Sequence, residues 1–158
     1  MGSPIKPYIL DLDKLKYLFR FDKVITPTEE NMIINAKSKI DYYNSIKSDF
    51  EVNIDSLPQN KTFQYLQSID KIQPIDNLKN TNKPVLIINS KNDFEVTEKH
   101  YTEWNSLLPK ENIKILHLDQ LNHIMSQSDN NSHPKDYRNE APISFTIFDS
   151  INKWVTNE

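Results

Sequence analysis

An aspartate and a histidine stand a few residues beyond the ends of two apolar segments in the second half of the chain. Asp93 follows the apolar run at 83–89, and His123 follows the run at 113–118. If these runs are neighbouring parallel strands, their carboxyl ends meet at one sheet edge, where α/β proteins place ligands and catalytic groups. A carboxylate there can hold a histidine in one tautomer and stabilise its imidazolium form. The spacing therefore predicts a pair able to take a proton from a serine hydroxyl.

The elements that must position this pair alternate between strand and helix. The segment 83–89 holds a continuous apolar run bounded by polar residues, which is typical of a buried parallel strand. We expect a helix from Thr97 to about Leu108, a strand at 113–118, a polar loop at 126–140 and a closing helix at 143–155. This strand–helix–strand–helix order belongs to a parallel sheet covered by helices, so the fold class is α/β. Two strands bury too little surface alone, so further sheet is expected from a missing segment or another chain.

The first half is predicted to be helical. Leucines at helical spacing indicate a short amphipathic helix at 9–21. Thr26-Pro27-Thr28-Glu29 has the pattern of a capping box and should begin a helix that runs to about Phe50. Its apolar stripe is expected to pack against the rest of the protein, with an acyl pocket as the alternative. The remaining segments are expected to be a loop at 51–61, a short helix or aromatic-bearing loop at 62–68, and a helical turn at 74–78.

Composition excludes several classes of function. Gly2 is the only glycine among 158 residues, so no glycine-built phosphate loop or nucleophile elbow is present. Ser90, at the tip of the first strand, is the least implausible substitute nucleophile. Cysteine is absent, which excludes disulfides, thiol nucleophiles and thiolate metal sites. The 19 basic and 22 acidic residues give no case for nucleic-acid binding. No apolar run approaches membrane length, and the charged first residues do not form a signal peptide, so the expected compartment is the cytoplasm.

The other histidines are expected to be structural. His117 lies within a predicted strand and should be buried and hydrogen-bonded, whereas His100 and His133 are expected to be solvated. A metal site drawn from His117, Asp119 and His123 is rejected, because strand geometry separates its two histidines and no other ligand pattern supports it.

Several segments resemble one enzyme superfamily. Residues 83–97, KPVLIINSKNDFEVT, resemble the acid-bearing strand and loop of the α/β-hydrolases, closest to bacterial esterases of the dienelactone-hydrolase-like and cinnamoyl-esterase-like kind. Residues 118–125, LDQLNHIM, resemble their histidine loop, and the segments 132–137 and 152–155 resemble their tail. The opening segment 2–7 and the helices after it resemble the region that follows the nucleophile strand, including the inserted cap.

The resemblance implies a partial α/β-hydrolase fold, the C-terminal half of such an enzyme. Residues 1–82 would be a helical cap and residues 83–158 the βαβα part of the core. Asp93 would be the acid and His123 the base of a carboxylic-ester hydrolase that uses no cofactor or metal. Ser90 and Gln120 stand where the family usually has glycine.

Two classes of function follow. The first is an ester hydrolase whose substrate is a small-molecule ester, and whose serine and oxyanion loop would come from an N-terminal half. The isolated chain is then expected to lack esterase activity, because it has no nucleophile. The alternative is a non-catalytic module that binds a ligand in its cap helices, or adds a strand from a partner or from a second copy in a homodimer. Neither reading involves nucleic acid or a membrane.

Overall fold

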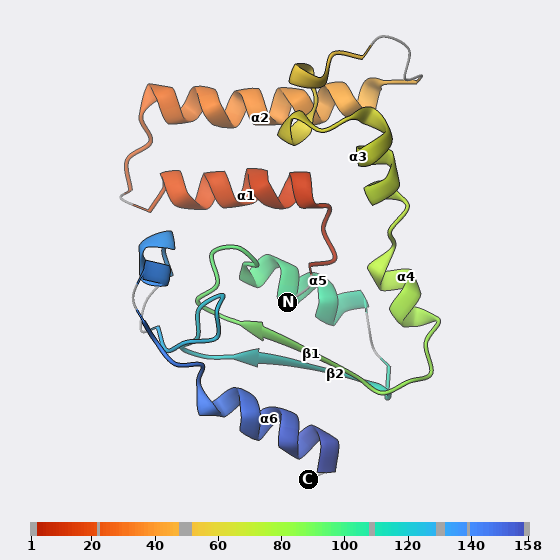
Figure 1. The fold of residues 1–158 in the computed structure, drawn as a ribbon, viewed down its shortest axis with the longest axis vertical. Coiled ribbons are helices and arrows are strands. Elements are labelled where there is room, and N and C mark those ends of the chain that lie inside the picture. Colours follow the sequence, from red (N-terminus) through yellow and green to blue (C-terminus); the bar gives the residue numbers. More distant parts are fainter. Residues whose placement is uncertain are drawn as a thin grey trace. The chain divides into compact units, whose positions relative to one another are not determined.

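The computed structural model describes residues 3–21, 23–47, 52–107, 110–128, 132–138 and 140–156 (Figure 1). It is a mixed helix and strand structure with a small parallel sheet, consistent with a partial α/β fold. The elements in chain order are α1 (Pro7–Phe19), α2 (Pro27–Ser45), η1 (Ile54–Ser56), η2 (Pro58–Asn60), α3 (Phe63–Asp70), α4 (Pro74–Lys79), β1 (Val85–Ser90), α5 (Glu98–Leu107), β2 (Ile113–Leu118), η3 (Pro134–Arg138) and α6 (Phe145–Thr156).

The chain divides into two compact units. One is the helical unit Ile5–Gln73, and the other is the strand-containing unit Pro74–Glu158, which includes Met1–Pro4. Within the described ranges, no helix combines the length and the apolar composition that a bilayer span requires.

The helical unit begins its longest helix at the predicted capping box. The Thr26 side chain accepts from the Glu29 backbone N–H at 3.3 Å, and the Glu29 carboxylate accepts from the Thr26 backbone N–H at 2.8 Å. Two of the N–H groups that a helix start leaves unpaired are satisfied in this way. The helix ends at Ser45, so the predicted continuation toward Phe50 is wrong. Ile46 is already extended, and its N–H donates to the Tyr43 carbonyl in a tight last turn.

A polar anchor and an aromatic cluster hold the helical unit together. The Tyr8 and Tyr43 hydroxyls each donate to a different oxygen of the Asp70 carboxylate, at 2.7 and 2.6 Å. Burial, followed by the Asp70 hydrogen bond, raises the pKa of both tyrosines. The Lys6 ammonium donates to the Asp70 backbone carbonyl at 2.7 Å. The core beside this anchor consists of Tyr8, Leu12, Ile40, Tyr43, Leu57, Phe63 and Leu66.

The predicted stripe of α2 only partly forms this core. Ile40 and Tyr43 are buried, whereas Met32 is 48% exposed. The segment predicted as a loop at 51–61 contributes η1, η2 and the fully buried Leu57. Thr62 caps α3 by accepting from the Tyr65 N–H, which favours the helix over the aromatic-bearing loop.

The second unit is built on two parallel strands. β1 pairs with β2 from Val85↔Ile113 to Ser90↔Leu118, which places the ends of both strands at one edge. Trp104 of α5 packs over one face with Ile113, against the partly buried Ile87. Both strands occupy the predicted segments, and α5 begins one residue after Thr97. The predicted helix end at Leu108 lies outside the described residues.

The closing helix differs from the prediction in its start and its burial. α6 starts at Phe145, because Ile143 forms an isolated antiparallel bridge with Ser126. Ile147 is buried, but Ile143 and Ile151 are 53% and 41% exposed. The predicted apolar face therefore exists, and the described part of the chain covers little of it.

The Asp70 anchor generates a stability prediction. Asp70→Ala leaves two tyrosine hydroxyls without their acceptor and should lower the free energy of unfolding by about 2–4 kcal/mol. The matched control is Asp41→Ala, which removes an exposed Lys37–Asp41 pair and should cost about 0.5 kcal/mol or less. Urea denaturation of the two variants measures the difference. Equal losses would contradict the anchoring role of Asp70.

Candidate active site

The loop after β1 carries Asp93 and is fastened to the loop after β2. The Lys91 N–H donates to the Leu118 carbonyl at 2.9 Å, and the Asn92 N–H donates to the Leu121 carbonyl at 3.1 Å. The Asn92 side chain also donates to the Ser128 carbonyl. The two loops are therefore one hydrogen-bonded assembly, which fixes Asp93 relative to the segment that carries the histidine.

The Asp93 carboxylate is completely shielded from solvent. Its Oδ1 accepts from the backbone N–H groups of Glu95 and Val96, at 2.7 and 2.9 Å. The Nδ1 of His123 lies 2.9 Å from Oδ2 and 3.1 Å from Oδ1. A buried carboxylate is stable only when donors compensate its lost hydration, and these three donors supply that compensation.

The loop that presents His123 turns without glycine. Gln120 and Met125 both have positive φ, at 55° and 61°, a region that glycine occupies without steric cost. The buried Asn122 side chain holds the turn, because its Oδ1 accepts from the Ile124 and Ser126 N–H groups, each at 3.1 Å. Hydrogen bonds thus maintain a backbone that the residue types do not favour.

The two ring nitrogens of His123 have different surroundings. Nδ1 faces the buried Asp93 carboxylate, whereas Nε2 lies 3.7 Å from the Glu95 carboxylate, and the side chain is 28% exposed. The hydrogen bond to Asp93 raises the pKa of His123, burial opposes that rise, and the charges of Asp93 and Glu95 add to it. In the neutral ring with its proton on Nδ1, the Nδ1–H donates a hydrogen bond to Asp93. The lone pair of Nε2 is then available to accept a proton. This arrangement suits a general base.

The structure brings together the two residues that the sequence singled out. Their catalytic role stays a prediction, but their contact is direct. Ser90 is buried, and its hydroxyl donates to the Asn122 carbonyl at 3.0 Å, so it braces the histidine loop. Sequence reasoning missed Asn122 and Glu95. An asparagine in a loop directly before a candidate histidine was an available signal, because asparagine side chains commonly bond to nearby backbone N–H groups in turns.

The remaining histidines differ from expectation. His100 is fully buried, so its predicted solvation is wrong. It lies four residues before the buried Trp104, and i and i+4 residues share one face of a helix. His117, predicted to be buried and hydrogen-bonded, is half-buried and stacks on Tyr101 with ring centroids 3.9 Å apart, and its Nε2 has no hydrogen-bond partner among the described residues. His133, predicted to be solvated, is half-buried and accepts from the Lys135 N–H.

In the residues that the structure describes, no group of three or more His, Asp or Glu side chains is arranged to hold a metal ion.

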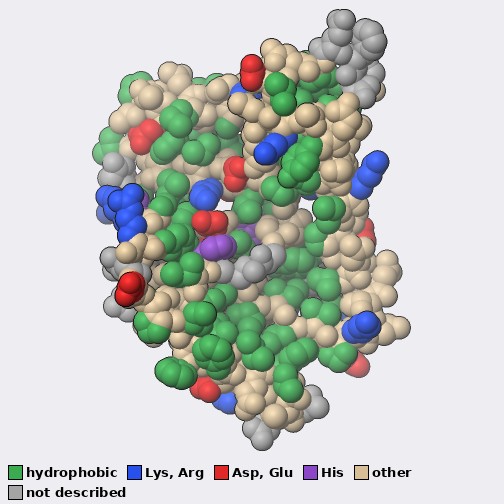
Figure 2. All heavy atoms as spheres, viewed as in Figure 1, with side chains coloured by type: hydrophobic (Ala, Val, Ile, Leu, Met, Phe, Trp, Pro, Cys, Tyr) green, Lys and Arg blue, Asp and Glu red, His purple; other side chains and the backbone are tan. Residues whose placement is uncertain are grey.

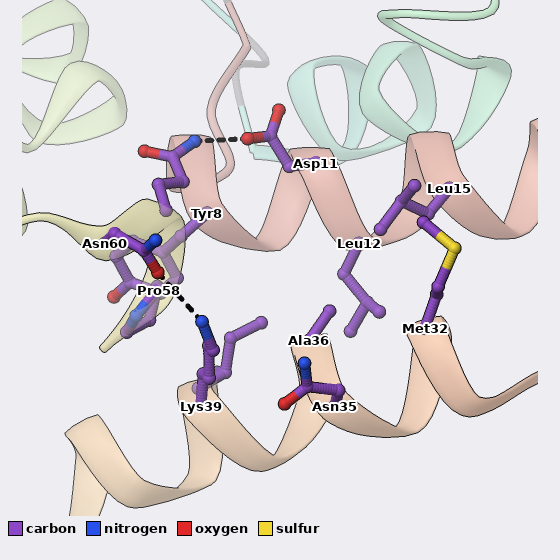
Figure 3. Close-up of a pocket in the computed structure, with 12 residues that line it drawn as sticks. Tyr8, Asp11, Leu12, Leu15, Met32, Asn35, Ala36, Lys39, Pro58 and Asn60 are labelled. Atoms are coloured by element: carbon purple, nitrogen blue, oxygen red, sulfur yellow. Dashed lines mark hydrogen bonds between the residues drawn. The ribbon is translucent and has the colours of Figure 1, made fainter. Parts of the chain in front are cut away.

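A separate pocket lies within the helical unit. It has a volume of about 430 Å³ and lies between α1 and α2, with η2 at one end (Figure 3). Leu12 and Ala36 face each other across it, and Lys39 donates to the Asn60 side chain at 2.8 Å beside it. The volume is within the range of small-molecule sites.

The ion pair generates a pH prediction. A raised pKa means that the stability supplied by protonated His123 is present below about pH 6.5 and is lost as the pH rises through the folded-state pKa. Asp93→Asn should lower the pKa of His123 and remove this contribution. Glu95→Gln should lower it less, because Glu95 is farther away. NMR titration of the imidazole measures both, and an unchanged pKa in Asp93→Asn would contradict the assignment.

Comparison with known proteins gives an esterase as a relative. The chain is 28% identical over 144 residues to the esterase EstD of Thermotoga maritima. The alignment covers 90% of this chain and 32% of that esterase, so the chain spans about a third of the length of the relative it matches. No protein-family model matches the chain, and no solved structure matches it. The similarity indicates an esterase-like relationship that extends along nearly the whole chain.

Proposed function

We propose that this chain is the acid- and histidine-bearing portion of a serine-dependent carboxylic-ester hydrolase of the α/β-hydrolase superfamily. The observation that carries the proposal is the contact between His123 Nδ1 and the buried Asp93 carboxylate, 2.9 Å apart, with Nε2 on the opposite side of the ring. The similarity to an esterase over 90% of the chain supports the same reaction class.

The proposed proton path follows from the two ring nitrogens. With the Nδ1–H hydrogen-bonded to Asp93 and retained on the ring, Nε2 accepts the proton of a serine hydroxyl as that oxygen attacks the ester carbonyl. The resulting imidazolium is stabilised by Asp93, with Glu95 adding negative charge 3.7 Å from Nε2. His123 then returns the proton to the leaving alcohol, and the same cycle with water releases the acid. The serine and the oxyanion donors belong to a polypeptide segment outside this chain.

The proposal also assigns roles to the two regions of the chain. Residues 83–158 would form the end of the catalytic core, because they hold both strands and both site loops. Residues 1–82 would form the helical cap. The proposed path uses protein groups, the ester and water, and it calls on no cofactor or metal.

A chimera tests the proposed reaction. This chain replaces the matched third of the T. maritima esterase, and hydrolysis of p-nitrophenyl acetate is measured. His123→Ala and Asp93→Asn should each lower kcat by roughly 10⁴-fold, since both act on one proton transfer. The matched control His133→Ala should leave kcat unchanged. Turnover that survives His123→Ala would contradict the proposal, as would steady His123-dependent turnover by the isolated chain, which has no assigned nucleophile.

The pocket between α1 and α2 favours a second candidate function, the binding of a small apolar acid. Leu12, Leu15 and Met32 supply apolar surface, Lys39 supplies a positive charge at the wall, and the carboxylate of Asp11, which also lines the pocket, accepts from the Gln59 side chain. A fatty acyl chain with a carboxylate head has matching chemistry.

This second function is tested by filling the pocket. Ala36→Phe places a ring between the two helices and should weaken binding of a fluorescent fatty acid by at least ~10-fold, because it removes the space that the acyl chain needs. Ile34→Phe is the control, because Ile34 is 54% exposed and does not line the pocket. Fluorescence titration of the full chain gives both affinities. Failure of the wild-type chain to bind the fluorescent fatty acid would contradict this function.

A further inference from the structure

Asn89, His100 and His117 carry buried polar atoms that have no hydrogen-bond partner in the described part of the chain. These atoms are Nδ2 and Oδ1 of Asn89 and the Nε2 atom of each histidine. Asn89 is 1% exposed, and His100 is fully buried. Burial removes the hydration of such atoms, and folded proteins nearly always replace it with a hydrogen bond to protein or to ordered water. The atoms therefore indicate a polar ligand beside these side chains.

The strands place Asn89 and His117 next to each other. Asn89 of β1 is the register partner of His117 of β2. Alternate residues of a strand share one face, so Asn89 lies on the face of Ile87, and His117 lies on the face of Ile115. Ile87 and Ile115 pack against the cluster that contains Trp104 of α5. Asn89 and His117 therefore lie on the face that α5 covers.

The first turn of α5 brings His100 over the same face. His100 and Trp104 are one helical turn apart, and residues at i and i+4 share one side of a helix. The Tyr101 ring stacks on His117. Figure 1 shows α5 on one side of the strands and α6 on the other. The unpaired atoms of Asn89, His100 and His117 therefore belong to one layer between α5 and the two strands.

The surroundings of this layer are apolar. Val85, Ile87 and Ile115 continue the covered face toward the other end of the strands. Figure 2 shows hydrophobic side chains gathered in the lower part of the view, where Figure 1 places the strands and α6. Apolar neighbours offer no hydrogen bonds, so a molecule held within the layer is needed to pair the buried polar atoms.

The donors and acceptors of the layer match a water molecule. His100 Nδ1 lies 3.2 Å from both the carbonyl and the hydroxyl oxygen of Thr97, and the bond made there decides whether Nε2 accepts or donates. Water fits either tautomer, because it both donates and accepts. The Asn89 amide adds N–H donors and a carbonyl acceptor, and a cation would leave those N–H groups unpaired. A buried water commonly makes about three hydrogen bonds, which these side chains can supply.

The layer joins the two ends of the loop that carries Asp93. Asn89 lies near the end of β1, where the loop begins, and His100 lies in the first turn of α5, which follows the loop. Within the loop, the Asp93 carboxylate accepts from the Glu95 and Val96 N–H groups. A water bonded to both Asn89 and His100 would fix the separation of the loop ends, and with it the position of this carboxylate.

We propose that Asn89 and His100 bind an internal water molecule that fastens the two ends of the Asp93 loop, with His117 Nε2 beside it. Asn89 and His100 are then positioning residues for the contact between Asp93 and His123. This water site is built within the strand-containing unit and does not depend on ester hydrolysis.

The first measurement uses the wild-type full chain. A rotating-frame Overhauser spectrum should show a cross-peak between water and Hδ2 of His100, the carbon-bound proton beside Nε2. Its sign should be opposite to that of the diagonal, which distinguishes a bound water from proton exchange. Absence of the cross-peak would overturn the proposal. A scalar coupling across a direct hydrogen bond between the Asn89 amide and His100 Nε2 would also overturn it.

Matched variants test the two side chains. Asn89→Leu removes the amide at similar volume and should abolish the water cross-peak. The control Asn105→Leu makes the same change at an exposed position of α5 and should retain it. His100→Phe removes the polar ring atoms, whereas His100→Gln keeps a donor and an acceptor in the layer. Circular dichroism checks the fold of each variant, and the wild-type spectrum decides the water site if a variant does not fold.

Amide hydrogen exchange tests the positioning role. In Asn89→Leu and His100→Phe, the two loop amides that donate to Asp93 should exchange at least ~10-fold faster, whereas the β2 amides should change less. In His100→Gln and Asn105→Leu the loop amides should keep wild-type rates. Equal acceleration of loop and β2 amides would indicate a general loss of stability and overturn the positioning role. Unchanged loop rates in Asn89→Leu would do the same. None of these readouts measures ester hydrolysis, so they stand or fail separately from the proposed function.

Discussion

A buried negative charge sets the main constraint on the strand-containing unit. The Asp93 side chain has no solvent contact, so its charge must be compensated by donors within the protein. Two backbone N–H groups and one imidazole nitrogen provide this, and each requires a particular loop conformation. The path of the chain from β1 into α5, and the approach of the histidine loop, are consequences of satisfying that carboxylate.

The histidine loop approaches the Asp93 carboxylate in a backbone conformation that its residue types do not favour. Gln120 and Met125 adopt positive φ although neither residue type favours it. The buried side chains of Asn122, Ser90 and Ser132 bond to backbone groups in and between the two site loops. Such support is expected where the orientation of an imidazole matters for chemistry, because catalytic groups need fixed geometry. Among the described residues, the same unit leaves one edge of β1 and much of α6 uncovered, so a well-organised site lies at the end of a sheet with two described strands.

The sequence predicted the parts of the fold that depend on local patterns. Both strands, the capping box at Thr26 and the contact of Asp93 with His123 follow from apolar runs, capping chemistry and the geometry of parallel sheets. The burial of His100 depends on which face of α5 turns inward, and the Asp70 anchor joins residues more than sixty positions apart. Neither has a local signature. The exposed face of α6 was not predictable either. An apolar stripe predicts that a helix face is buried, but it does not identify the surface against which that face packs.

The tautomer of His123 is the most direct test of the central claim that Asp93 orients this histidine for proton transfer. The ¹⁵N spectrum of the neutral imidazole, recorded on the full chain above the pKa of His123, reports which nitrogen carries the proton. The account predicts protonation at Nδ1, where the Asp93 carboxylate accepts, and a free lone pair at Nε2. Protonation at Nε2 would mean that Asp93 does not set the tautomer, and would contradict the assignment of these residues as acid and base.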